Sequence, residues 1–177
     1  MVGLVRSDWN LAFAAVNKWR GECMHHFSAV EMAVTETLFA LDAAKLEGVT
    51  IGLRHFIGQR LEDLTSAVAQ QGPFGVQAKA ARQMLEHYRR EHEGFRTTLC
   101  HGMIKVVLEC NGKWLLIVRN LSIVRRQADA GLVVLEQAEA EAKLAALKHD
   151  GQKLSATRGQ LRKTFAVRSA ASLNPSQ

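Results

Sequence analysis

The apolar positions in the first part of the chain recur at the spacing of an α-helix. The clearest stripe consists of Cys23, Phe27, Val30, Val34, Leu38 and Leu41. Steps of three and four residues place these side chains on one face of a helix. The pattern predicts a first helix that is capped by Ser7 or Asp8 and bent or broken at Gly21, and a second that ends near Gly48.

Two further helical patterns follow this stripe. Thr50 can cap the first of them. Its apolar face consists of Leu53, Ile57, Leu61, Leu64 and Val68. Glycine and proline between residues 70 and 75 then interrupt the pattern. The apolar side of the next helix consists of Ala80, Met84, Tyr88, Phe95 and Leu99. We expect that helix to end at Gly102, with the glycine as its C-terminal cap.

After this helix the periodicity changes. Two runs, residues 103–109 and 113–119, are rich in residues that favour β-strands. Asn111 and Gly112 lie between them, and this pair supplies the positive φ angles that a type I′ turn needs. The sequence therefore predicts a β-hairpin at residues 103–119.

The last part of the chain returns to helical spacing. A short third strand at residues 121–124 can come first, and Asp129 then caps the last helix. A heptad repeat is formed by Leu147, Leu154 and Leu161. Such a repeat is a candidate seam for a partner helix. Residues 169–177 are expected to form a disordered tail.

Together these elements predict a mainly α fold, a helical bundle of about four to five helices with one inserted β-hairpin. The chain has 177 residues, which suits one domain with a sizeable core, over residues 1–168. Hydrophobic residues make up 47% and charged residues 23%, as is typical of a soluble globular protein.

Composition also bears on location and partners. No apolar run reaches the roughly 18 residues that a membrane span needs, so no membrane partner is expected. The N-terminal residues lack an apolar signal-peptide core, and the three cysteines have no CxxC spacing, which together favour the cytoplasm. The net charge of +6 favours an anionic partner such as nucleic acid.

Chemistry is suggested by arginine and histidine five positions apart. Three such pairs occur: Arg20/His25, Arg82/His87 and Arg96/His101. On an ideal helix such residues point about 140° apart, so the first two pairs, inside helical patterns, are poor sites. Arg96 and His101 lie where a helix is expected to end, which would free His101 from the helical direction. Arginine can grip a phosphate, and histidine can transfer a proton near neutral pH.

The segment from Phe95 to Gly102, at the end of a third helix, resembles the HEPN family (higher eukaryote and prokaryote nucleotide-binding domains). The helix from Phe27 to Leu38 is similar to the acid-bearing early helix of that family, and the likeness extends from Cys23 to Leu147. The resemblance implies a helical bundle that forms a homodimer with both motifs in one cleft. Many members are metal-independent endoribonucleases of toxin–antitoxin, phage-defence or RNA-processing systems.

The resemblance also implies roles for three residues. Arg96 would stabilise the scissile phosphate, and His101 would act in proton transfer or orient the ribose 2′-hydroxyl. Thr97 stands where active members commonly have Asn, Asp or His, which is a departure from the family pattern. No cofactor and no metal are implied, and an antitoxin or another partner protein would be expected beside RNA.

Alternatives remain open at this point. Arg96 can pair with Glu91, Glu93 or an acid on another helix, and His101 can cap its helix, so that the motif needs no ligand. The protein would then be a non-catalytic homodimeric interaction module. A third interpretation is a basic accessory protein that binds nucleic acid without cleaving it. The candidate phosphate contacts are Arg89, Arg90, Arg125 and Arg126. His87 and Glu91 have the i, i+4 spacing of metal ligands, but a third ligand would have to come from elsewhere, so no metal is assigned.

Overall fold

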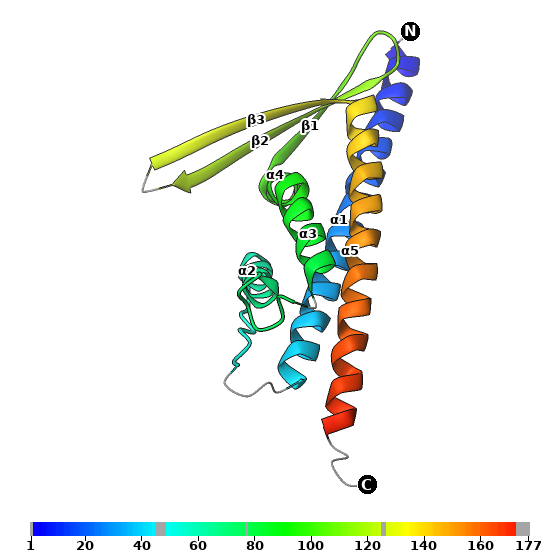
Figure 1. Ribbon diagram of the computed structural model, residues 1–177. Helices are drawn as coiled ribbons and strands as arrows, with labels where there is room; N and C mark the ends of the chain where they lie inside the picture. The colour runs from blue at the N-terminus through cyan, green and yellow to red at the C-terminus, as the bar shows by residue number, and fades with distance from the viewer. Residues whose placement is uncertain (1, 45–48, 77, 125–126, 173–177) are drawn as a thin grey trace. The chain divides into compact units, whose positions relative to one another are not determined.

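The computed structural model describes residues 2–44, 49–76, 78–124 and 127–172. The protein is mainly α-helical and carries one three-stranded antiparallel sheet (Figure 1). In chain order its elements are α1 (Val2–Ala43), α2 (Ile57–Val68), α3 (Lys79–Tyr88), a π-helical turn (Arg89–Glu93), α4 (Gly94–His101), β1 (Met103–Leu108), β2 (Trp114–Val124), β3 (Gln127–Glu136) and α5 (Gln137–Ser172).

The chain divides into two compact units. The first, here called the sheet unit, comprises Met1–His26 and Glu91–Lys148. It contains the N-terminal part of α1, α4, the sheet and the start of α5. The second, the helical unit, comprises Phe27–Arg90 and His149–Gln177 and contains α2, α3 and the remaining parts of α1 and α5.

Helix α1 runs without a break through Gly21, so the expected bend or break there is wrong. A glycine inside a helix costs roughly 1 kcal/mol relative to alanine. Trp19 and Cys23, which flank Gly21, are both buried and hold the helix in place by packing. The predicted stripe from Cys23 to Leu41 is buried throughout, as expected for a core face.

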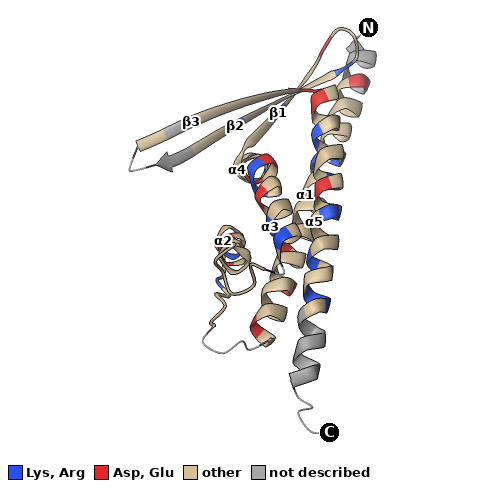
Figure 2. Ribbon diagram, viewed as in Figure 1, with Lys and Arg blue, Asp and Glu red and all other residues tan. Residues whose placement is uncertain are grey.

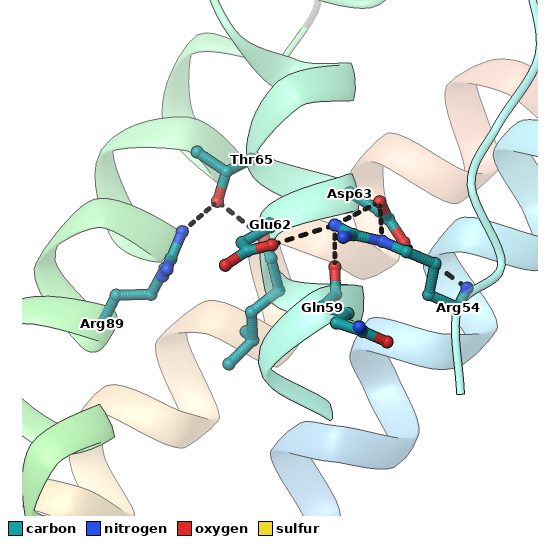
Figure 3. Close-up of polar contacts among 7 residues, drawn as sticks. Arg54, Gln59, Glu62, Asp63, Thr65 and Arg89 are labelled. Atoms are coloured by element: carbon teal, nitrogen blue, oxygen red, sulfur yellow. Dashed lines mark hydrogen bonds and ion pairs between the residues drawn. The ribbon is translucent and has the colours of Figure 1, made fainter. Parts of the chain in front are cut away.

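Helix α2 begins at Ile57, later than the predicted start at Thr50. The preceding loop is held against α2 by Arg54, whose guanidinium donates to Asp63 Oδ1 (2.8 Å), Glu62 Oε2 (3.0 Å) and the Gln59 carbonyl (2.9 Å) (Figure 3). The hydrogen bond to Asp63 raises the pKa of Arg54. Leu53 lies in this loop and is exposed, so it does not belong to the helical face.

Helix α5 contributes buried leucines to both units. The leucines of the heptad repeat, Leu147 in the sheet unit and Leu154 and Leu161 in the helical unit, are all buried within the chain itself. The expectation that they form a seam for a partner helix is therefore wrong, because the protein's own core covers them. Helix α5 passes through Gly151 and Gly159 and continues to Ser172. The first residues of the expected tail, 169–172, are thus helical, and residues 173–177 lie outside the described part.

The sheet has the strand order β1-β2-β3 and is more than the single hairpin expected. Strand β2 extends to Val124, so the predicted third strand at 121–124 is the continuation of the second. The actual third strand covers the region where Asp129 was expected to cap a helix. Its β-branched centre pairs with β2 in the register Ile117 to Val134 and Val118 to Val133. Pairing with β2 overrides the helical spacing there.

The hairpin between β1 and β2 is confirmed, with a different turn. The amide of Gly112 donates to the Glu109 carbonyl (3.0 Å), and that of Glu109 donates to the Lys113 carbonyl (2.8 Å). Three residues therefore form the loop, with Gly112 at φ 82°, in place of the predicted two-residue type I′ turn. A three-residue loop with a left-handed glycine is a common hairpin connection.

Candidate functional site

Helix α4, which carries the arginine–histidine motif, is anchored in the sheet unit by Trp19. The Trp19 ring lies 6.2 Å from the ring of Phe95 in α4 and 6.2 Å from that of Trp114 in β2, centre to centre. Its Nε1 donates a buried hydrogen bond of 2.7 Å to the Ala140 carbonyl in α5. One α1 side chain thus joins α4, the sheet and the start of α5, and so sets where the motif lies.

The C-terminal end of α4 is held by a residue that sequence reasoning did not assign. Arg20 in α1 donates from Nη2 to the Leu99 carbonyl at 2.8 Å. The amide of Gly102 donates to the Thr98 carbonyl at 2.9 Å. The last carbonyls of a helix lack the partners that interior carbonyls have, and these two bonds satisfy those of Thr98 and Leu99. Arg20 is the arginine of the pair Arg20/His25, which was expected to be a poor site. Its spacing from His25 gave no indication that Arg20 binds the end of α4.

Gly102 fits its position because of close packing. Gly102 is the C-terminal cap of α4, as predicted, and its backbone, at φ −80° and ψ 141°, is extended and not left-handed. A Cβ at this position would overlap the Val118 side chain and would lie 2.5 Å from Asn120 Oδ1. The chain therefore passes directly over β2 as it leaves α4.

Arg96 and His101 both belong to α4, so the expectation that His101 escapes the helical direction is wrong. Five positions along one helix turn their side chains about 140° apart. Arg96 is half-buried and His101 is exposed. Thr97 is exposed, and its hydroxyl donates to the Glu93 carbonyl one turn earlier (3.1 Å). Within one chain, the side chains of Arg96, Thr97 and His101 therefore do not converge on one site.

His101 opens instead onto a hollow beside β2 and β3, here called the α4 hollow. Its volume is about 530 Å³. It is lined by His101, Met103, Arg119, Asn120, Leu121, Ala130, Gly131 and Leu132. Neither Arg96 nor Thr97 lines it. Among the described residues that line the hollow, Arg119 is the permanently charged cation. It was assigned no role from the sequence, because β2 was expected to be one strand of a hairpin. Asn120 Oδ1 is buried and has no hydrogen-bond partner among the described residues.

The candidate nucleic-acid arginines lie elsewhere or outside the described residues. Arg89 donates to Thr65 Oγ1 at 3.0 Å (Figure 3), and Arg90 lies 3.0 Å from His87 Nδ1. Both belong to the helical unit, whereas the α4 hollow belongs to the sheet unit. Arg125 and Arg126 fall outside the described part of the chain. Figure 2 shows acids interleaved with lysine and arginine on α5, and few charged residues on β2 and β3.

The geometry around His87 does not favour the metal site considered for His87 and Glu91. His87 Nε2 pairs with Asp150 Oδ2 at 3.0 Å and its Nδ1 faces Arg90, so both ring nitrogens have partners. Across the described residues, no group of three or more potential ligand side chains is arranged to hold a metal ion.

Of the helices in the described ranges, none combines the length and the apolar character needed to cross a membrane. Comparisons with protein-family models, with curated proteins and with solved structures found no match.

Proposed function

We propose that the protein is an HEPN-like RNA-binding protein that acts as a metal-independent endoribonuclease at the α4 hollow. The observation that carries the proposal is that His101 and Arg119 line one open hollow of about 530 Å³. That volume lies in the range of small-molecule pockets and accommodates a nucleotide. The positive net charge of +6 supports attraction to RNA before specific contacts form.

The chemistry follows from these two side chains. Arg119 neutralises the scissile phosphate, as a guanidinium does through paired donors. His101 takes the proton from the ribose 2′-hydroxyl, whose oxygen attacks the phosphorus. The bond from phosphorus to the 5′-oxygen breaks, and the protonated imidazole returns the proton to that oxygen. The products are a 2′,3′-cyclic phosphate and a 5′-hydroxyl end, with no net loss of atoms or charge.

Arg96 and Thr97 enter this proposal through a second copy of the chain. Since Arg96 points about 140° from His101 along α4, it cannot serve the hollow of its own chain. The resemblance implies a homodimer in which two motifs share a cleft, and there Arg96 and Thr97 of one copy would face the hollow of the other. The cleavage assay below separates this contribution from that of Arg119.

The test is cleavage of a labelled single-stranded RNA of mixed sequence in the presence of EDTA. We expect cyclic phosphate ends from the wild type and their loss in both His101→Ala and Arg119→Ala, with melting temperatures unchanged. His25→Ala is the matched control, because His25 is exposed on α1 and lies outside the hollow. Arg96→Ala reduces cleavage only if the homodimer completes the site. RNA left intact by the wild type refutes the nuclease.

A non-catalytic homodimeric interaction module is the second candidate, and one observation favours it. Large apolar side chains are exposed along one part of the sheet: Met103, Leu121, Leu132 and Val134. Exposed apolar patches of this kind commonly mark interaction surfaces. This candidate predicts a dimer in sedimentation that Leu132→Glu dissociates, with neither RNA binding nor cleavage. Salt-sensitive RNA binding without products would instead indicate a binding protein that lacks nuclease activity.

A further inference from the structure

A second hollow lies in the sheet unit, between the N-terminal part of α1 and the outer edge of β1. We call it the α1–β1 groove, and its volume is about 670 Å³. It is lined by Asp8 and Trp9 of α1, by residues 105–108 of β1, by Glu109 and Cys110, which follow β1, and by Gly112. None of these residues lines the α4 hollow, so the groove is a separate surface.

The β1 wall of this groove is an open strand edge. In the order β1-β2-β3, β1 is hydrogen-bonded to β2 alone among the described strands. Glu109 directs its amide and its carbonyl toward the β2 side of the hairpin. Backbone groups alternate in direction along a strand, so those of Lys105 and Val107 also face β2. The amides and carbonyls of Val106 and Leu108 therefore point into the groove.

The opposite wall is an exposed aromatic surface. Trp9 is 42% exposed, although tryptophan is among the most apolar large side chains. Its ring stacks on Phe13, with ring centres 5.2 Å apart and planes at 15°. An exposed tryptophan is the type of residue that anchors a partner at an interface.

The two ends of the groove carry side chains of opposite charge. Figure 1 shows the N-terminal end of α1 beside the β1–β2 turn, and Asp8 and Glu109 both line the groove. Lys105 lies four residues before Glu109, which is about 13 Å along an extended strand. The groove thus has an acidic end near the turn and a basic end near the middle of β1.

We propose that the α1–β1 groove binds an extended peptide segment of a partner protein as an antiparallel fourth strand on β1. An extended peptide backbone can pair along the edge with the amides and carbonyls of Val106 and Leu108, which pair with no other described strand. The antiparallel direction places the N-terminal end of the peptide at Glu109 and Asp8. The preferred segment therefore carries Lys or Arg first and Asp or Glu four residues later, with apolar or β-branched residues between them. This inference goes beyond the proposed ribonuclease and does not depend on it.

The probe is a set of fluorescein-labelled hexapeptides with Lys first, Glu fifth, and combinations of Val, Ile, Thr, Tyr and Phe elsewhere. Binding to the full chain is measured by fluorescence anisotropy. We expect members of the set, such as acetyl-Lys-Val-Thr-Val-Glu-Thr-amide, to bind in the micromolar range. If no member binds at about 1 mM peptide, the proposal is overturned.

The backbone contacts are tested with the best peptide of the set. Its second and fourth residues would exchange hydrogen bonds with Leu108 and Val106, so N-methylation of those two amides should abolish binding. The third amide faces away from β1, and its N-methylation is the matched control that retains binding. Equal binding of both methylated peptides would refute strand addition.

The aromatic wall is tested on the protein side. Trp9→Ala should weaken the peptide about tenfold. Leu11→Ala, which removes an exposed apolar residue of the same helix outside the groove, should leave the affinity unchanged. Sedimentation of the wild type and of Trp9→Ala tests whether a second copy of the chain occupies the groove in place of a peptide. A wild-type dimer that becomes monomeric in Trp9→Ala would assign the groove to a second copy and overturn the proposal.

Discussion

Asn120 lies against the backbone of Gly102: a Cβ at Gly102 would come within 2.5 Å of Asn120 Oδ1. The backbone of Gly102 is extended, at φ −80°, which any residue can adopt. The glycine is therefore required by space and not by conformation. This close approach seats the end of α4 on β2, and it brings His101 to the same hollow as Arg119.

Gly102→Ala should lower the free energy of unfolding by about 1–3 kcal/mol, since the added methyl group overlaps Val118 and crowds Asn120. Urea denaturation measures the change. Gly94→Ala in the same helix is the control, because its Cβ would meet nothing within 4 Å. Alanine there should raise the stability by about 0.5–1 kcal/mol. Equal effects of the two substitutions would contradict the packing argument.

The three cysteines should differ in their reactivity toward iodoacetamide at pH 8. Cys110 is exposed, Cys100 is partly buried and Cys23 is buried. Burial, with a smaller effect of the nearby Glu22 charge, raises the pKa of Cys23 to about 12. Since the thiolate is the reactive form, Cys110 should be labelled first and Cys23 only through unfolding. Mass spectrometry of the peptides gives the order, and in urea all three should react alike.

Stability should fall as the pH is lowered below 6.5, in part because of His26. Partial burial, followed by the charges of His25 and Lys148, lowers the pKa of His26 from 6.5. Between pH 6.5 and the lower folded pKa, the unfolded chain binds more protons than the folded one. The free energy of unfolding therefore decreases as the pH falls through this window.

Urea midpoints measured from pH 8 to pH 5 test this linkage. His26→Gln should show a smaller decrease than the wild type, whereas the exposed His149→Gln should follow the wild type. An unchanged pH profile for His26→Gln would show that His26 does not contribute.

Arg158 should be replaceable by methionine with a gain in stability. It is 1% exposed, and it donates to two backbone carbonyls, of Leu154 (3.1 Å) and Val30 (3.4 Å). Its Nη2 has no partner among the described residues, and burial lowers its pKa to about 10. A buried charge without a carboxylate partner costs more in desolvation than such contacts return.

Arg158→Met keeps the packing of the stem and removes the charge, so it should raise the free energy of unfolding by about 1 kcal/mol. Arg158→Lys keeps the charge but has a less suitable donor geometry, so it should lower the free energy of unfolding. Thermal or urea denaturation distinguishes the two. A methionine variant less stable than the wild type would show that the two carbonyl contacts outweigh the desolvation.

Local chemistry in the sequence determined several features of this protein. The buried stripe from Cys23 to Leu41 follows from helical periodicity, because such spacing has one stable arrangement against a core. The hairpin around Gly112 follows from β-favouring runs on either side of a turn. The interruption after Val68 follows from the glycines and proline there.

Only the tertiary structure decided the rest, because it depends on residues far apart in the chain. The segment from Gln127 to Glu136 became a strand because β2 offered a partner that helical spacing could not reveal. The leucines at 147, 154 and 161 became core because the chain's own helices cover them. Arg119 reached the hollow of His101 because Gly102 passes tightly over β2. The sequence thus determined which elements can form, and long-range packing decided which residues meet.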